Sequence, residues 1–170
     1  MTKLPTECFL KIFNNFRNDY KNLFSFLLVN RHWCRIIVPI LWNEPTIYIR
    51  DRRLIKIYLL SLNAEERALI TSLKIIVRKY PKPLFEYTSY TRNVGYKLTD
   101  GIKDWIYYEK YGANKSKNSI LIREVIKDED ELVDTIECSL VAMFLRTSKK
   151  LRNLTFSGKI NEMIFERLYR

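Results

Sequence analysis

Residues 4–42 read LPTECFLKIFNNFRNDYKNLFSFLLVNRHWCRIIVPILW and carry three consecutive helical patterns. In the first pattern, apolar side chains recur at i, i+3, i+4 and i+7, through Phe9, Ile12, Phe13 and Phe16. This spacing places them on one face of a helix. Pro5 suits the first helical position, where its missing N–H costs nothing. The sequence therefore predicts a helix from about residue 5 to residue 15.

Two further helices are predicted directly after the first. Asp19 can cap a short helix that is apolar nearly all round, so we expect that helix to be buried on several sides. Its apolar residues are Leu23, Phe24, Phe26, Leu27, Leu28 and Val29. A third helix begins near Asn30, with an apolar face formed by Trp33, Ile36, Ile37, Ile40 and Leu41. Pro39 disfavours helical conformation at Val38 and is expected to end or kink this helix there, leaving Leu41 and Trp42 on a final turn.

The surplus of large apolar side chains in this segment is a reason to expect a partner. Three helices in about forty residues make a small core, and a module of this size is rarely stable without disulfide bonds, metals or a partner. Trp33 and Trp42 are of the residue type that carries interface energy. Composition alone leaves open whether both tryptophans pack inside the chain instead.

Taken together, these residues resemble an F-box. The family's anchors stand in order with ordinary spacing, as Leu4-Pro5-Thr6-Glu7, Ile12-Phe13, the run from Leu27 to Trp33, and Pro39-Ile40-Leu41-Trp42. The sequence departs from the family pattern at Phe16, where Leu is commoner, and in a longer polar first turn over residues 17–20. The resemblance is to F-box proteins of fungi and covers about a quarter of the chain. It implies a three-helix F-box that binds a Skp-family adaptor, which is itself attached to a cullin scaffold.

The resemblance also assigns residues to roles by their position in the motif. The expected adaptor-binding residues are Leu4, Pro5, Leu28, Val29, Trp33, Leu41 and Trp42. The residues expected to hold the three helices together are Ile12, Phe13 and Ile37. The function implied is that of a substrate-receptor adaptor subunit of a Skp–cullin–F-box ubiquitin ligase. Such a subunit has no catalytic residues and needs no cofactor or metal.

The remaining chain is expected to be mainly helical, so we divide the sequence into an F-box at residues 1–45 and a helix-rich target-recognition region at residues 46–170. Only 4 Gly and 5 Pro occur, too few for the many turns of a sandwich or barrel. Thr46–Ile49 is a β-branched and aromatic run that favours a short strand. Helical spacing continues through Leu54, Ile55, Tyr58, Leu59 and Leu62.

Capping signals place the later helices. Asn63 with Glu66 has the spacing of a capping box and is expected to open a helix over residues 64–69. Pro83 can begin a helix over residues 84–91, and Asp100 can cap another around residues 102–108. The polar residues 113–119 are interpreted as a loop. A long helix is expected at residues 129–145, with the acidic residues 128–131 at its start, where the helix dipole favours negative charge.

The end of the chain contains a possible repeat. Leu151-Arg152-Asn153-Leu154-Thr155-Phe156 has the pattern L-x-x-L-x-F, and with the preceding helix it resembles one leucine-rich repeat within residues 130–170. In that architecture each repeat adds one strand to a curved sheet, and about three repeats are needed for stability. The alternative is a strand or packing segment of a mainly helical domain. Ile160, Ile164, Phe165 and Leu168 then continue on helical spacing.

Composition and motifs argue against an enzyme, a metal protein and a membrane protein. Cys8, Cys34 and Cys138 are far apart and form no CxxC pair, so neither a metal site nor a disulfide framework is expected. The single histidine, His32, has no partner by motif, and no G-x-S-x-G, HExxH, P-loop or G-x-G-x-x-G pattern occurs. No apolar stretch reaches the roughly 20 residues that span a bilayer. We expect a soluble protein of the cytosol or nucleus.

Two other functions stay open from the sequence. The net charge of +11 fits a lysine-rich solvated surface, but it also allows a nucleic-acid partner. Single strands could stack on tyrosines beside basic residues. The residues concerned are Tyr80, Tyr87, Tyr90, Tyr96, Tyr107 and Tyr108 with Arg78, Lys79 and Arg92. The second alternative is an F-box protein that binds its adaptor but acts outside a ligase.

Overall fold

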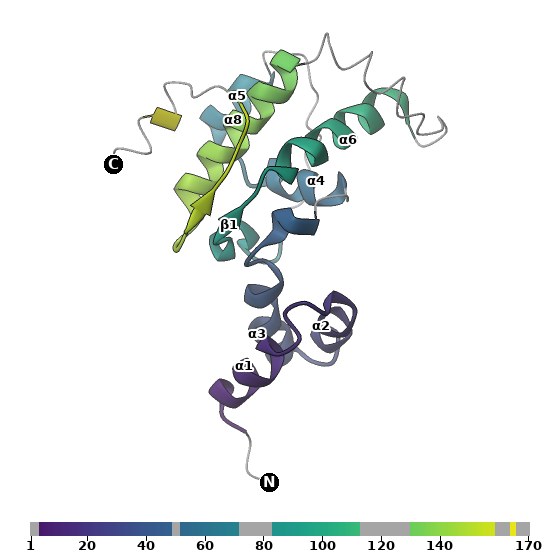
Figure 1. Cartoon of the computed structure of the whole chain (residues 1–170), viewed down its shortest axis with the longest axis vertical. Coiled ribbons are helices and arrows are strands. Elements are labelled where there is room, and N and C mark those ends of the chain that lie inside the picture. The colour runs from purple at the N-terminus through teal and green to yellow at the C-terminus, as the bar shows by residue number, and fades with distance from the viewer. Residues whose placement is uncertain (1–3, 49–51, 72–82, 113–129, 159–163, 166–170) are drawn as a thin grey trace.

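The computed structural model describes residues 4–48, 52–71, 83–112, 130–158 and 164–165. Within these residues the chain forms seven α-helices, two 3-10 helices and two very short strands, so the mainly helical fold predicted from the sequence is confirmed. Figure 1 shows a lower body near the N-terminus, made of α1, α2 and α3, and an upper body made of the later elements. None of the described helices is long and apolar enough to cross a membrane.

The lower body begins as the sequence predicts. Its helices are α1 (Thr6–Asn14), α2 (Tyr20–Leu27) and α3 (Arg31–Leu41). The Asp19 carboxylate accepts the N–H of Asn22 at 3.2 Å, and the Asn30 side chain accepts the N–H of Trp33 at 2.8 Å. These caps satisfy first-turn donors of α2 and α3 and fix where both helices begin. Pro5 stands at the N-cap of α1, one residue before the first helical position.

Of the two outcomes expected at Pro39, an end or a kink, the first does not occur, because α3 continues through Pro39 to Leu41. Proline lacks only its own N–H, which would have bonded the carbonyl four residues earlier. The next turn is intact, since the N–H of Trp42 donates to the carbonyl of Val38 at 3.0 Å. Ile36, Ile37 and Val38 are all buried, so packing holds the helix on its course through the proline.

The core of the lower body is small. Its buried residues are Phe13, Leu23, Ile36 and Ile37. Partly buried side chains surround them, among them Phe9, Phe16, Phe26, Leu27, Trp33, Ile40 and Leu41. The expectation that α2 would be buried on several sides is wrong for this chain, because Leu23 alone is buried on that helix. One face of α2 is therefore left to solvent.

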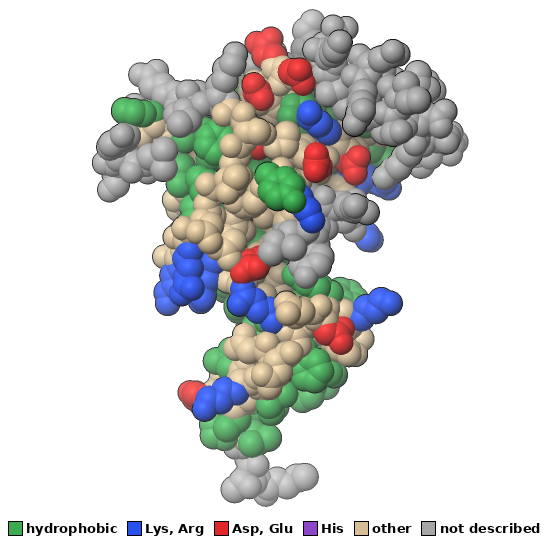
Figure 2. All heavy atoms as spheres, in the orientation of Figure 1, with side chains coloured by type: hydrophobic (Ala, Val, Ile, Leu, Met, Phe, Trp, Pro, Cys, Tyr) green, Lys and Arg blue, Asp and Glu red, His purple; other side chains and the backbone are tan. Residues whose placement is uncertain are grey.

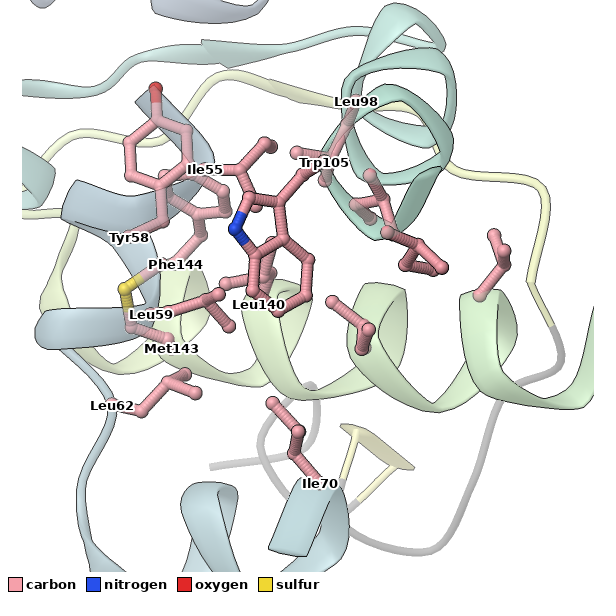
Figure 3. Packing of buried hydrophobic residues seen from close by; sticks show 14 of the residues in the cluster. Ile55, Tyr58, Leu59, Leu62, Ile70, Leu98, Trp105, Leu140, Met143 and Phe144 are labelled. Atoms are coloured by element: carbon pink, nitrogen blue, oxygen red, sulfur yellow. The ribbon is translucent and has the colours of Figure 1, made fainter. Parts of the chain in front are cut away.

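The upper body is built around one larger core (Figure 3). Its helices are α4 (Arg52–Leu60), α5 (Ala64–Thr71), α6 (Lys97–Tyr111) and α8 (Asp130–Thr147). Figure 3 shows the Trp105 indole reaching from α6 toward Leu140 of α8, and the Tyr58 ring meets the Phe144 ring edge-on at 5.0 Å. The buried members of this core are Ile55, Tyr58, Leu59, Leu62, Ile70, Val94, Leu98, Ile102, Trp105, Ile106, Val133, Ile136, Leu140, Met143 and Phe144.

The predicted capping box at the start of α5 is confirmed. The N–H of Glu66 donates to the Asn63 side-chain oxygen at 2.9 Å, and the Glu66 carboxylate accepts the N–H of Asn63 at 2.8 Å. This reciprocal pair satisfies two donors at the helix start. The Glu66 carboxylate is fully buried and also accepts two hydrogen bonds from Arg146 of α8, at 2.9 and 2.8 Å. The cap thereby ties α5 to α8.

Three predicted elements differ from those observed. The expected strand at Thr46–Ile49 is instead a 3-10 helix, η1 (Pro45–Tyr48), because the Thr46 hydroxyl bonds the N–H of Gly95 at 2.7 Å. Residues 84–91 form only the short 3-10 helix η2 (Tyr87–Tyr90). Helix α6 begins at Lys97, so Asp100 lies in its first turn and does not cap it. The predicted helix at 129–145 is confirmed as α8, while the loop predicted at 113–119 lies outside the described residues.

The two strands, β1 (Asn93–Val94) and β2 (Asn153–Leu154), pair in parallel, with Asn93 opposite Asn153. The residue before β1 also bonds the segment that follows α3, because the N–H of Arg92 donates to the carbonyl of Asn43 at 2.8 Å. On the other side, the N–H of Arg152 donates to the carbonyl of Arg92 at 2.7 Å. Three segments far apart in the sequence therefore lie side by side.

Side chains follow this backbone alignment. Asn153 donates from its amide to the Asn93 side-chain oxygen at 2.9 Å, and Asn93 donates to the Glu44 carboxylate at 2.6 Å. Glu44 also forms an ion pair with Arg17 of the lower body. We call Arg17, Glu44, Asn93 and Asn153 the polar ladder. It joins the segment that follows α1 to both strands of the upper body.

Candidate docking surface

Four of the residues that the F-box motif assigns to adaptor binding lie outside the helices and are exposed. Leu4 and Pro5 precede α1, while Leu28 and Val29 lie in the turn between α2 and α3. Leu28 is 68% exposed and Val29 is 58% exposed. Figure 2 shows hydrophobic side chains gathered on the surface of the lower body. Exposed apolar side chains that gather on one surface make that surface a candidate for docking.

Trp33 has a divided role. Its indole packs against the small core, with ring centroids 5.0 Å from Phe13, 5.8 Å from Phe9 and 6.1 Å from Phe26. It is only partly buried, so one part of the ring remains accessible. The indole therefore packs among the three helices, while the residue as a whole stays partly accessible to solvent. Leu41, at the end of α3, is likewise partly buried against the same core.

Trp42 stands at the junction of the two bodies. Its indole stacks on the Tyr87 ring with centroids 4.4 Å apart and meets the Tyr58 ring edge-on at 6.0 Å. It packs against the large core of the upper body, although the motif would place it at the end of the F-box. Trp42 thus holds the lower body against the upper body, and one face of its ring is used within the chain.

The three residues assigned to the F-box core are placed differently from one another. Phe13 and Ile37 are buried in the small core, at 2% and 0% exposure. Ile12 is 44% exposed and is not a member of that cluster. Leu10, two residues earlier on α1, is also exposed. The side chain of Ile12 therefore adds to the exposed apolar surface.

The structure adds residues that sequence reasoning missed. Phe24 of α2 is exposed although its apolar neighbours suggested burial. Among the large apolar residues that the structure describes, Leu84 is the most exposed, at 86%. The all-round apolar character of α2 was the available signal for Phe24, since a helix apolar on every side needs a second partner. No local sequence pattern singles out Leu84, because its position beside the lower body depends on where the chain returns to that body.

Two cavities lie between α2, α3 and the segment before η2. The first has a volume of about 550 Å³ and is lined almost entirely by apolar side chains. Its lining residues are Tyr20, Phe24, Leu27, Cys34, Val38, Leu41, Trp42, Pro45, Leu54, Ile57, Leu84, Phe85 and Tyr87. The second, of about 780 Å³, is lined by Leu27, Leu28, Asn30, Arg31, Cys34, Arg35, Leu84 and Phe85.

The charged side chains that line these cavities are all basic. Arg31 and Arg35 line the second cavity, and none of the described side chains that line either cavity is acidic. At the wall of the first cavity, burial raises the pKa of the Tyr87 phenol, with a further contribution from Cys34. Tyr87 therefore stays neutral at ordinary pH, and arginines supply the charge at the rim.

Across the described residues, no group of three or more His, Cys, Asp or Glu side chains could hold a metal ion. His32 lies edge-on to the Phe9 ring, with centroids 5.6 Å apart. The imidazole therefore acts as a packing partner for α1.

The tyrosines proposed for nucleic-acid stacking are partly engaged elsewhere. The Tyr87 ring is stacked on Trp42, and the Arg52 guanidinium lies 3.5 Å from the centroid of the Tyr108 ring. Ring faces covered in this way are not free to stack on bases. Arg78, Lys79 and Tyr80 lie outside the described residues.

Comparison with known families agrees with the lower body. A family model described as F-box-like matches residues 1–48, which span α1, α2, α3 and η1. No curated protein and no solved structure has a significant match to the chain. Residues 1–48 are therefore an F-box-like domain. The match gives no support to the fungal likeness or to a leucine-rich repeat, since it ends before residues 130–170.

Proposed function

We propose that this chain is a substrate-receptor subunit of a Skp–cullin–F-box ubiquitin ligase and that its lower body docks onto a Skp-family adaptor. The observation that carries the proposal is the exposed apolar surface of α1–α3, which coincides with the F-box-like match. A core of four buried residues is too small to stabilise three helices well, so a partner that covers this surface contributes to their stability. Leu4, Pro5, Leu28 and Val29 are the proposed anchors.

The proposed contribution to ubiquitin transfer is proximity. A receptor that holds a target beside a charged ubiquitin-conjugating enzyme converts a chance encounter into a tethered reaction. No residue of this chain needs to act on the target chemically, and no cofactor or metal is required. The proposal implies a location in the cytosol or nucleus, where the ligase partners act.

We further propose that residues 46–170 select the target. The order of α8 followed by β2, which pairs in parallel with β1, is the observation behind interpreting residues 130–170 as a repeat-like segment. Leu151 and Leu154 pack against the large core, and Phe156 packs against a second cluster on the outer side of α8. The L-x-x-L-x-F residues thus face the helix that precedes them, as a repeat requires.

Co-expression with a Skp-family adaptor, followed by size-exclusion chromatography, tests the docking proposal. We expect a stable one-to-one complex that is lost in the variant Leu4→Ala/Pro5→Ala and in Leu28→Asp. These residues are exposed, so their substitution leaves the fold of the chain intact. Tyr96→Asp is the matched control, because Tyr96 is an exposed large side chain on the upper body.

Two outcomes of this experiment would contradict the proposal. In the first, the chain is soluble alone and ignores the adaptor. In the second, the folded Leu4→Ala/Pro5→Ala and Leu28→Asp variants bind as well as the wild type. Co-purification of a cullin with the complex then separates a ligase subunit from an F-box protein that acts outside a ligase.

A further inference from the structure

The segment Leu84–Phe85 lies outside the F-box-like match but borders the surface of the lower body. Leu84 lines both cavities while remaining 86% exposed. The Phe85 ring lies 5.7 Å from the Tyr87 ring, and Tyr87 in turn stacks on Trp42. This row of three aromatic rings holds the segment beside α3. The chain therefore returns to the F-box-like domain after leaving it.

The two cavities adjoin each other. They share four lining residues, which are Leu27, Cys34, Leu84 and Phe85. We call the combined cavities the α2–α3 groove. Part of the lining comes from α2 and α3, and part comes from Leu84 and Phe85. The first cavity is lined in addition by Trp42, Pro45, Leu54, Ile57 and Tyr87. Phe24 and Leu28, both largely exposed, stand at its edge, so the groove presents apolar surface that no described segment covers.

The rim of the groove defines the chemistry of its occupant. Arg31 and Arg35 are exposed and line it, without an acidic neighbour in the lining. Electrostatic complementarity therefore favours an occupant with an apolar ridge and carboxylates at its flank. A second copy of this chain fits poorly, because its net charge of +11 would bring like charges together.

The groove shares a residue with the proposed adaptor-binding surface, which favours the adaptor as its occupant. Leu28 is one of the proposed adaptor anchors and also lines the second cavity of the groove. A partner that covers Leu28 must reach the groove, and a separate target protein placed there would compete with the adaptor. An amphipathic helix laid into an apolar groove is a common mode of recognition.

We propose that Leu84 and Phe85 extend the docking surface beyond the F-box-like domain and that the α2–α3 groove receives an apolar helix of the Skp-family adaptor, flanked by acidic residues. This inference rests on the proposed function, since it assumes that the adaptor binds the lower body. Under this proposal, the upper-body segment Leu84–Phe85 contributes to adaptor binding although it lies outside the F-box motif. Adaptor affinity therefore depends on residues at both ends of the groove.

Titration of the full chain with purified Skp-family adaptor tests the role of Leu84. Burial of a leucine side chain at an interface contributes favourably to the free energy of binding. We therefore expect Leu84→Asp to weaken binding by about tenfold or more. The far-ultraviolet circular dichroism of this variant should match the wild type, because Leu84 is largely exposed and is not part of a hydrophobic cluster. Tyr96→Asp serves as the control and should bind as the wild type does.

Comparison with the motif variants separates failure of this inference from failure of the proposed function. If Leu4→Ala/Pro5→Ala abolishes binding while Leu84→Asp binds normally, the extension is wrong and the docking proposal stands. If the wild type does not bind the adaptor at all, the proposed function fails and the extension fails with it.

The charge of the rim is tested by reversing it. Arg31→Glu/Arg35→Glu should weaken binding at least tenfold at low salt, and raising the salt concentration should narrow the difference from the wild type. Lys150→Glu, a reversal at an exposed residue outside the groove, should have little effect. Equal affinities for the rim variant and the wild type would overturn the proposed acidic flank.

A photo-crosslinker identifies the occupant directly. Leu84→p-benzoylphenylalanine, irradiated in the presence of the adaptor, should give an adduct on an apolar adaptor segment that carries neighbouring acidic residues. Alkylation of Cys34, which lines both cavities, should also slow when the adaptor is bound. An adduct only with a second copy of this chain, or no adduct at saturating adaptor, would overturn the assignment.

Discussion

At the scale of single residues, Glu66 shows how strongly one buried charge depends on its partner. Its carboxylate is fully buried and is held by the Arg146 guanidinium and the N–H of Asn63. The hydrogen bond to Glu66 raises the pKa of Arg146, so the guanidinium keeps its charge. Removing the Arg146 cation would take a countercharge away from a buried carboxylate, which is the costly half of breaking a buried pair.

We expect Arg146→Met to lower the free energy of unfolding by about 2 kcal/mol. This value lies below that of a fully buried pair, because the Arg146 side chain is 35% exposed and water screens part of the interaction. Urea denaturation followed by circular dichroism measures the change. The double variant Glu66→Leu/Arg146→Met should recover much of the loss, since it removes the stranded charge. A loss in the double variant as large as in Arg146→Met would contradict this account.

Cys138 gives the chain a pH dependence at high pH. Burial, followed by the nearby carboxylates of Asp134 and Glu137, raises the pKa of its thiol from 9.0 to about 11. Between these values the unfolded chain releases a proton that the folded chain retains, so stability falls as pH rises above about 9. Below pH 9 the thiol is protonated in both states and contributes no such dependence.

The corresponding measurement is urea denaturation at pH 8 and at pH 10. The wild type should lose stability between these two values, and Cys138→Ala should lose less. Tyr58, whose pKa burial also raises, contributes in the same direction in both proteins, so the difference between them isolates the thiol. Cys8→Ala, at a half-buried position on α1, is the matched control and should follow the wild type. Identical pH profiles for Cys138→Ala and the wild type would rule out this contribution.

At the scale of secondary-structure elements, α3 carries a proline in its last turn. Replacing Pro39 with alanine restores an N–H that can bond the carbonyl of Arg35 and improves helix propensity. We expect Pro39→Ala to raise the free energy of unfolding by about 1 kcal/mol, less than in a helix interior because the proline is near the helix end. Pro45→Ala is the control and should destabilise, because Pro45 is buried in η1. Urea denaturation distinguishes the two, and a Pro39→Ala variant less stable than the wild type would contradict this expectation.

The elements predictable from the sequence were those with local start signals. Asp19, Asn30 and the Asn63–Glu66 box each mark a helix start by side chains that bond the backbone a few residues away. Thr46–Tyr48 was mispredicted because its conformation depends on a hydrogen bond to Gly95, far along the chain. β-Branched composition is a weak guide to strands when tertiary contacts decide.

For the candidate docking surface, the sequence motif indicates only part of what the structure shows. The motif identifies Leu4, Leu28 and Val29, whose exposure follows from their place before α1 and between helices. It does not separate Trp42, which packs at the junction of the two bodies, from the residues that face solvent. Nor can it find Leu84, because only the folded chain brings that residue to α2 and α3.

At the scale of the whole molecule, the polar ladder connects the two bodies. Arg17 lies in the turn after α1, Glu44 precedes η1, and Asn93 and Asn153 belong to the paired strands. Hydrogen bonds and one ion pair link each member to the next. For the proposed receptor function, such a connection would help to fix where a bound target stands relative to the adaptor.

Glu44 is the member on which this connection depends, since its carboxylate accepts from Arg17 on one side and from Asn93 on the other. We expect Glu44→Ala to lower overall stability by only about 1 kcal/mol, because both contacts are partly solvated. Its larger effect should be local. Hydrogen exchange measured by mass spectrometry should become faster in α1–α3 than in α8, because the lower body opens more often on its own.

Lys56→Ala provides the matched control for this prediction. It breaks the Lys56–Glu109 ion pair, a contact of 2.9 Å that joins α4 to α6 within the upper body. The side chains of that pair are about as accessible as those of Arg17 and Glu44. If the polar ladder couples the bodies, Lys56→Ala should leave exchange in α1–α3 unchanged while Glu44→Ala accelerates it. Equal acceleration in α1–α3 and α8 for Glu44→Ala would mean that Trp42 and its aromatic partners hold the junction without the ladder.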